Sequence, residues 1–156
     1  VELLIASTGA VPAFKGYRGF PASICASINE EVVHGIPDRR VLREGDIISV
    51  DVGVLLNGFY GYTAFTFPVG KISPKTADLL LTTRESLEQA IAAAEVGKRV
   101  GLIGQTVQQL CEGKGYTVVR ELAGHGVGRN LHEDPSVPNF GREDEGVALE
   151  EGMVFA

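Results

Sequence analysis

Cysteine is scarce in this sequence, and its two cysteines form no motif. Cys25 and Cys111 lie far apart and make no CxxC pair, so we expect free thiols in a cytoplasmic protein rather than a disulfide framework. No signal peptide is visible, and no apolar run approaches the ~20 residues that span a membrane. No basic cluster stands out and the formal net charge is -6, so nucleic acid is not expected as a partner. The chain is therefore expected to act in the cytoplasm, away from membranes and nucleic acids.

Glycine, by contrast, is abundant. The chain holds 20 glycines in 156 residues, roughly twice the ordinary usage, which indicates many tight turns or close approaches of the backbone. Hydrophobic residues make up 44%, enough for a sizeable core. Because the composition shows no break, residues 1–156 are expected to form a single domain or a piece of one.

The two ends of the chain indicate that it is one piece of a longer domain. The chain begins with Val1 rather than Met, and residues 150–156 read as a turn followed by the start of a buried strand. An apolar strand that stops there leaves backbone groups in need of a neighbour. We therefore expect a domain that is truncated at its C-terminus.

Short apolar or β-branched runs bounded by turn residues predict the extended segments. These segments are 23–29, 47–55, 63–69, 116–122 and from 153 onward. The pair Asn57-Gly58 between two apolar runs predicts a β-hairpin.

Two helices are predicted between the strands. The first begins at Ser73-Pro74, a suitable cap and first helical residue, continues through apolar residues at helical spacing to Ala94, and ends at Gly97. The second covers 102–112 and ends at Gly113. Strands, two helices and further strands in that order predict an α+β fold, with helices on one face of an antiparallel sheet.

Two polar outliers are the strongest candidates for chemistry. Asp51 interrupts the apolar run 47–54, and a carboxylate buried among valines requires a partner, either a metal ion or an Arg. His125 lies between Gly124 and Gly126, where the missing side chains let the backbone approach a ligand closely. A plain turn histidine is the alternative. A buried Asp with glycine-flanked histidines is typical of a metal-assisted hydrolase.

Three further residues have both a functional and a structural interpretation. His34 stands alone in a turn and His132 precedes two carboxylates, so each is either a catalytic group or a solvated surface residue. Cys25 lies within a predicted strand. It is either a small buried residue or part of a pocket wall, and no base pairs with it for nucleophilic work.

Together these motifs indicate one protein family, because they follow one another in that family's order along nearly the whole chain. The sequence closely resembles the bacterial-type (type I) methionine aminopeptidases. The segments that carry the resemblance are Gly16–Glu30, His34–Pro37, Gly45–Gly53, Gly124–Gly128 with His132–Glu133, and Glu151–Phe155.

The resemblance implies a pita-bread (creatinase/aminopeptidase) fold, in which an antiparallel sheet cradles two divalent metal ions (Co, Mn, Fe, Zn or Ni) and helices pack on its outer face. The family removes N-terminal methionine from newly made proteins. Among its five metal ligands, Asp51 matches an Asp and His125 matches the His. The resemblance gives His34 and His132 the catalytic, substrate-contacting roles, and it places Tyr17 and Cys25 in the pocket for the methionine side chain.

The chain departs from the family at the remaining ligands. Tyr62 stands where the family has a second Asp that bridges both metals. A phenol, with a pKa near ~10, is mostly neutral at pH 7 and a poor ligand for hard divalent ions. Both Glu ligands of the family would lie beyond Ala156, so the second half of the fold is incomplete. At most one weakly held ion is expected.

The leading hypothesis is therefore a methionine aminopeptidase homologue, acting on N-terminal Met peptides, whose present chain is impaired. The first alternative is a non-catalytic pita-bread protein that binds peptides. The second is a fragment that self-associates through an exposed sheet edge. Related enzymes that cleave Xaa-Pro or creatine bonds are disfavoured, because the contexts of Cys25 and His34 are typical of the methionine-specific group.

Overall fold

A computed structural model describes residues 1–156 of the chain. It divides the chain into two compact units. The first unit comprises Val1–Pro74 and Gly128–Leu131, and the second comprises Lys75–Val127 and His132–Ala156. A single domain was predicted, and its residues fall into these two units.

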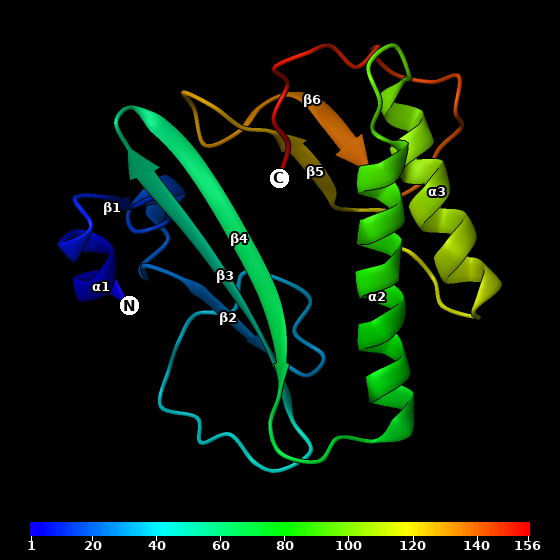
Figure 1. Ribbon diagram of the computed structural model, residues 1–156. Coiled ribbons are helices and arrows are strands. Elements are labelled where there is room, and N and C mark those ends of the chain that lie inside the picture. Colours follow the sequence, from blue (N-terminus) through cyan, green and yellow to red (C-terminus); the bar gives the residue numbers. More distant parts are fainter. The chain divides into compact units, whose positions relative to one another are not determined.

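The first unit is built on an antiparallel sheet (Figure 1). Strand β3 is central, since β1 and β2 pair with it on one side and β4 on the other. The elements are α1 (Glu2–Ser7), β1 (Val11–Pro12), the short 3-10 helix η1 (Tyr17–Gly19), β2 (Cys25–Ile28), β3 (Ile47–Leu56) and β4 (Phe59–Pro68).

The β3–β4 hairpin confirms the turn predicted from the sequence. Leu56 pairs with Phe59 across the turn, so Asn57 and Gly58 form a two-residue loop. Both have positive φ, 52° and 82°, as a type I′ turn requires and as Asn-Gly readily supplies. The predicted strand 63–69 begins earlier than expected, at Phe59, because this turn pairs β4 with β3 along its full length.

The register gives this sheet two different faces, because directly paired residues share a face. Asp51 pairs with both Cys25 and Ala64, and Gly53 pairs with Tyr62. The face that carries Asp51 therefore also carries Cys25 and Tyr62. The opposite face is apolar, and its members on β3 and β4 are Ile48, Val50, Val52, Val54, Phe65 and Phe67.

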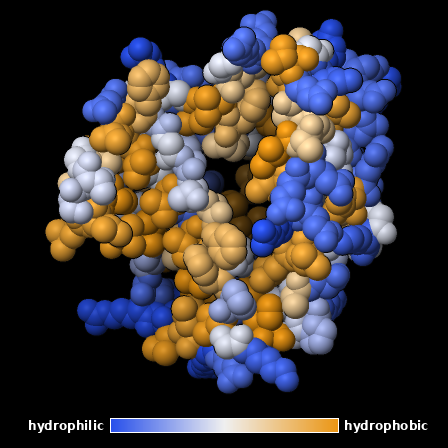
Figure 2. Space-filling model, in the orientation of Figure 1, coloured by the Kyte–Doolittle hydropathy of each residue, from blue (hydrophilic) through white to orange (hydrophobic).

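The apolar face is largely open, and this corrects the expectation that Asp51 lies among buried valines. Phe65 and Phe67 are 56% and 49% exposed, while Val50, Val52 and Asp51 are all half-buried. Figure 2 shows hydrophobic surface over the part of the molecule that holds β3 and β4. The burial cost attributed to the Asp51 carboxylate is correspondingly smaller.

The second unit combines two helices with a hairpin. Helix α3 packs against strand β6, and β5 pairs antiparallel with β6. The elements are α2 (Pro74–Ala93), α3 (Val100–Gly113), β5 (Ala123–Gly126) and β6 (Glu133–Pro138). Both predicted helices are confirmed, with α2 ending at Ala93 rather than at Gly97. No helix combines the length and the hydropathy needed to cross a membrane.

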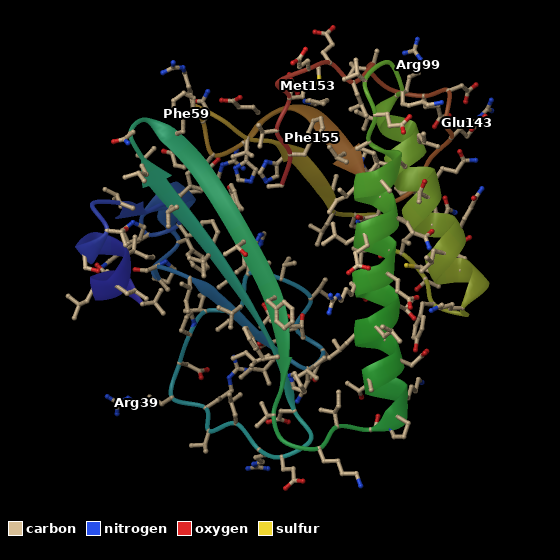
Figure 3. The ribbon with its side chains drawn as sticks, viewed as in Figure 1. Arg39, Phe59, Arg99, Glu143, Met153 and Phe155 are labelled. Carbon is tan, nitrogen blue, oxygen red and sulfur yellow. The ribbon has the colours of Figure 1, made fainter.

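One predicted strand is wrong, and another forms only as a short pairing. Residues 116–122 do not form a strand; the carbonyls of Val119 and Leu122 accept hydrogen bonds from the Asn139 side chain (3.0 and 3.2 Å) instead of joining a ladder. The segment from Met153 onward pairs antiparallel with the end of β5, through the Phe155–Gly126 bridge, two backbone hydrogen bonds between Ala156 and His125, and one from the Val127 N–H to the Val154 carbonyl. Figure 3 labels Met153 and Phe155 on this C-terminal segment. For residues 116–122, β-branched and apolar composition does not lead to sheet pairing.

Candidate functional site

The Asp51 face of the first unit carries a compact apolar cluster. Phe14, Cys25 and Leu131 are its buried members, with Tyr17 and Tyr62 packed against them. Because Cys25 pairs directly with Asp51, the cluster adjoins the carboxylate. The structure therefore brings together four of the residues singled out in the sequence: Tyr17, Cys25, Asp51 and Tyr62.

Gly53 makes room for this cluster. A Cβ at Gly53 would collide with the ring of Phe14, so the absent side chain lets the ring lie over the strand. That ring in turn packs against Tyr62, with ring centroids 5.6 Å apart and planes tilted by 47°. The glycine in the Asp-Val-Gly sequence was a usable signal for this close approach, whereas Phe14 was missed because nothing in its local sequence marks it.

Cys25 is a buried thiol rather than an exposed nucleophile. It is 5% exposed, and burial together with the neighbouring Asp51 raises its pKa to about 11. A thiol with so high a pKa holds little thiolate near neutral pH. The interpretation of Cys25 as a small buried residue is thus confirmed, and it also forms part of the apolar cluster.

Tyr62 is bonded to a distant part of the chain. Its hydroxyl donates a hydrogen bond of 2.9 Å to the carbonyl oxygen of Leu131. Burial and then the nearby Asp51 carboxylate raise the pKa of the Tyr62 phenol above its ordinary value. Both effects disfavour the phenolate, so the side chain is a neutral hydrogen-bond donor.

His34 lies in the loop between β2 and β3, and its side chain is exposed. Its φ of 61° is unusual for a residue with a side chain. The following residue is fixed to β2: the Ala26 N–H donates to the Gly35 carbonyl (2.8 Å) and the Gly35 N–H to Ser27 Oγ (3.1 Å).

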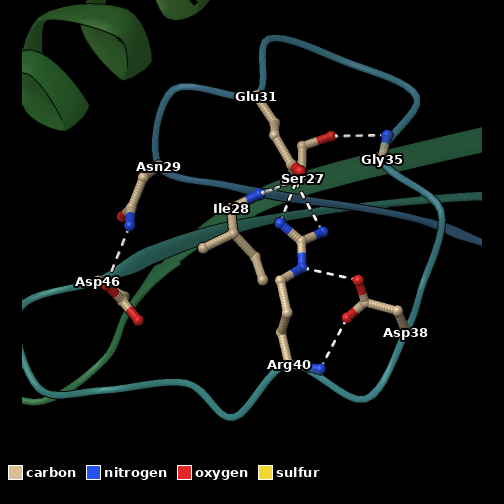
Figure 4. A network of polar contacts seen from close by, with 8 residues as sticks. All are labelled: Ser27, Ile28, Asn29, Glu31, Gly35, Asp38, Arg40 and Asp46. Carbon is tan, nitrogen blue, oxygen red and sulfur yellow. Dashed lines mark hydrogen bonds and ion pairs between the residues drawn. The ribbon is translucent and has the colours of Figure 1, made fainter.

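A polar network holds the rest of this loop (Figure 4). Arg40 donates to both carboxylate oxygens of Glu31, at 2.6 and 3.2 Å, and to Asp38 at 2.8 Å. At the other end, Asn29 donates to Asp46 (3.0 Å). The loop that carries His34 is therefore tied down at several points, although its ion pairs are solvent-exposed and each is worth little.

The second unit brings His125 and His132 together. Their ring centroids lie 4.1 Å apart with the planes tilted by 38°. His125 is half-buried on β5, and His132 is exposed just before β6. The β5–β6 pairing, which runs from Ala123 to Pro138, positions the two imidazoles.

The glycines around His125 lie against neighbouring backbone. A Cβ at Gly124 would lie 2.6 Å from the Ala156 carbonyl oxygen, and one at Gly126 would collide with the Asp134 carbonyl. His125 itself exchanges two backbone hydrogen bonds with Ala156, at 2.8 and 2.9 Å. These glycines therefore allow close packing of neighbouring chain segments.

The donor set for a metal ion is small. Asp51 lies in the first unit, and His125 and His132 lie in the second. No three His, Cys, Asp or Glu side chains gather into a group that could hold a metal ion. Tyr62 is the residue beside Asp51 on the same face, and its proton is donated to Leu131.

Comparison with known proteins identifies the relatives of this chain. Residues 3–156 match the metallopeptidase family M24. A methionine aminopeptidase of Clostridium acetobutylicum is 53% identical over 156 residues, which are 99% of this chain and 62% of that protein. The crystal structure of the Rickettsia prowazekii methionine aminopeptidase superposes with a TM-score of 0.96 at 42% identity, covering 99% of this chain and 62% of that one.

A prolidase from Pyrococcus furiosus has the same fold. It superposes with a TM-score of 0.84 at 25% identity and covers 99% of this chain and 43% of that one. The pita-bread fold expected from the sequence is thereby confirmed. The chain spans about 62% of the length of the methionine aminopeptidases that it matches.

Proposed function

Because this chain belongs to the metallopeptidase family M24, we propose that it is part of a methionine aminopeptidase, which hydrolytically removes N-terminal methionine from newly made proteins in the cytoplasm. The observation that carries the proposal is its similarity, at 53% identity over 99% of its length, to a protein of that name. The Asp51 face supports it, because a carboxylate adjoins an apolar cluster there.

The residues divide into three roles. Tyr17 and Cys25 would line the pocket for the apolar methionine side chain, since both belong to the buried cluster. Asp51 and His125 would be metal ligands. His34 and His132 would contact the substrate and stabilise charge that develops on the scissile carbonyl.

The described residues do not fit the two-metal centre that the resemblance implies. A divalent ion of this kind requires several anionic or imidazole ligands, and Tyr62 supplies a neutral phenol already engaged with Leu131. With Asp51 and His125 as its ligands, the chain would hold at most one weakly bound ion. We therefore propose that its peptidase activity is low or absent.

The Tyr62–Leu131 hydrogen bond favours a second candidate function, a pita-bread protein that binds peptides without cleaving them. Such a protein would keep the apolar cluster and the histidines while holding no metal pair. Self-association through an exposed sheet edge is a further proposed partner interaction, and Phe65 and Phe67 of the first unit, 56% and 49% exposed, would add apolar surface to it.

Metal titration tests the proposal most directly. Calorimetric titration of the purified chain with Mn²⁺ or Co²⁺ should show no binding or one weak site, and Asp51→Ala should remove that site. Two tight sites that disappear in Asp51→Ala would contradict the expected impairment.

A peptidase assay on a Met-Xaa-Xaa peptide completes the test. Tyr62→Asp alone should not produce turnover, because Asp51, His125 and one added carboxylate are still too few ligands for a two-metal centre. Measurable turnover in Tyr62→Asp would refute this account of the site. Binding of the same peptide without turnover, in the unmodified chain, would favour the non-catalytic alternative.

A further inference from the structure

The segment Gly128–Leu131, which we call the docked segment, is attached to the beginning of β4. Its residues belong to the first unit, whereas the residues on both sides of it in the sequence belong to the second. Gly128 accepts a hydrogen bond from the Tyr60 N–H (2.7 Å), and the Arg129 guanidinium lies 4.8 Å from the centre of the Phe59 ring. Figure 3 labels Phe59 at the turn end of the strand.

The third attachment is the hydrogen bond from the Tyr62 hydroxyl to the Leu131 carbonyl, at 2.9 Å. Leu131 is 3% exposed and packs with Phe14 and Cys25. A carbonyl beside such a buried side chain is costly to leave unpaired. The hydroxyl satisfies it, and the docked segment is thus held at both of its ends, by Tyr60 and by Tyr62.

The bond requires the protonated phenol. A phenolate has no proton to donate, so coordination of a cation by the Tyr62 oxygen as phenolate would break the bond to Leu131. Tyr62 and Asp51 occupy diagonal positions on one sheet face, where side chains remain within reach of each other. Anchoring of the docked segment and metal ligation by the phenolate are therefore mutually exclusive uses of this side chain.

We propose that Tyr62 is an anchor that fixes the docked segment to β4, and that this role takes the place of metal ligation in this chain. The proposal goes beyond the proposed function, since it requires neither a bound peptide nor a bound metal. It distinguishes the hydroxyl from the ring: if Tyr62 only filled space, its hydroxyl would be dispensable.

Tyr62→Phe separates these two roles, because it keeps the ring and removes the hydroxyl. The docked segment contains a trypsin site after Arg129, so cleavage there, followed by mass spectrometry, reports its release. In Tyr62→Phe we expect this cleavage, and amide exchange at Tyr60, to accelerate about fivefold, the factor that one net hydrogen bond supplies. Tyr116→Phe, which removes a hydroxyl bonded to Asp78 (2.8 Å), should change neither rate.

Equal cleavage and exchange in Tyr62→Phe and in the unmodified chain would overturn the anchor. Should Tyr62→Phe fail to fold, hydrogen exchange in the unmodified chain still tests whether the segment is docked on β4, as the anchor requires. Its Tyr60 amide should exchange at least tenfold more slowly than that of Arg39, an exposed residue of the loop shown in Figure 3. Comparable exchange at the two amides would refute the docked segment itself.

A separate experiment tests whether Tyr62 is excluded from binding a metal ion. Mn²⁺ added to the unmodified chain should leave the cleavage rate at Arg129 unchanged, because no cation displaces the hydroxyl from Leu131. Fe³⁺ should produce no visible absorption band of an iron–phenolate complex. Accelerated cleavage on adding Mn²⁺, or such a band that disappears in Tyr62→Phe, would show that Tyr62 is a ligand and overturn the proposal.

Discussion

Gly53 and Phe14 show how a single missing side chain shapes the candidate site. The Phe14 ring occupies the space that a Cβ on Gly53 would need, and it carries the contact to Tyr62. The sheet face around Asp51 thus depends on a glycine whose role is steric. Its backbone is extended, so conformational freedom is not the reason for it.

Gly53→Ala is expected to lower the free energy of unfolding by about 1–3 kcal/mol, the usual cost of overpacking. Gly61→Ala is the matched control on the adjacent strand, because a Cβ there meets open space, and it should change stability by less than about 0.5 kcal/mol. Urea unfolding of both variants provides the measurement. Equal stability of the two would show that Phe14 does not lie over Gly53.

Cys25 makes the free energy of unfolding depend on pH in the alkaline range. Its pKa is raised to about 11 by burial and by Asp51, so the folded chain holds the thiol proton more tightly than the unfolded chain. The stabilising contribution is complete below the unfolded pKa of ~8.5. It is lost as pH rises from there through about 11.

Cys25→Ala should therefore flatten the decline of unfolding free energy between about pH 8.5 and 11, even though the smaller side chain lowers stability at every pH. Chemical denaturation at several pH values checks this. Parallel declines in the two proteins would mean that the thiol does not titrate differently on unfolding. Cys111→Ala serves as the control, because Cys111 is only half-buried.

At the scale of elements, helix α3 depends on a close approach to the chain that follows β6. A Cβ on Gly104 would lie 2.5 Å from the Phe140 carbonyl oxygen and 2.7 Å from that of Pro138. Backbone atoms cannot move aside as a flexible side chain does. The small residue therefore sets how near the helix can lie to β6.

Gly104→Ala is expected to destabilise the protein by about 1–3 kcal/mol, although alanine is the better helix former. Gly113→Ala, in the last turn of the same helix, meets nothing within 4 Å and should raise stability by up to about 1 kcal/mol through helix propensity. Thermal unfolding followed by circular dichroism would compare them. A gain in stability for both would contradict the close packing of α3.

The elements that the sequence predicted well carry strong local signals. Asn57-Gly58 forms the predicted turn, and both long helices lie where apolar spacing and end residues placed them. The strand predicted over residues 116–122 was wrong, because their apolar composition could not reveal the hydrogen bonds to Asn139, which lies 20 residues from Val119.

The candidate site was predictable in part for the same reason. Asp51 and Tyr62 could be placed on one face from the hairpin alone, and Cys25 from its strand. The bond from Tyr62 to Leu131 joins residues 69 apart in the sequence, and no local pattern indicates such a contact. Only the structure identifies Phe14 and Leu131 as members of the site.

For the molecule as a whole, large apolar side chains are exposed in both units. Phe65 and Phe67 of the first unit and, on helix α2, Leu81 and Leu87 are all about half exposed. Exposed apolar surface of this extent favours association.

The purified chain is therefore expected to self-associate with increasing concentration, as sedimentation velocity would show. Phe65→Ser should weaken the association several-fold, since it removes an aromatic side chain from the open sheet face. Val41→Ser is the control, because Val41 is 84% exposed and lies in a loop. A monomer at all concentrations, or equal weakening by both substitutions, would refute association through this face.

The bond between Tyr60 and Gly128 also limits what can be added to the sheet. Strand β4 is the last strand on its side of β3, and the amide of Tyr60 points away from β3 because the Leu56–Phe59 pair closes the hairpin. That outward amide is already occupied by the chain itself. On this side of the sheet, a foreign β-strand could therefore pair only with the rest of β4, and the docked segment blocks edge-to-edge aggregation at the turn end of the hairpin.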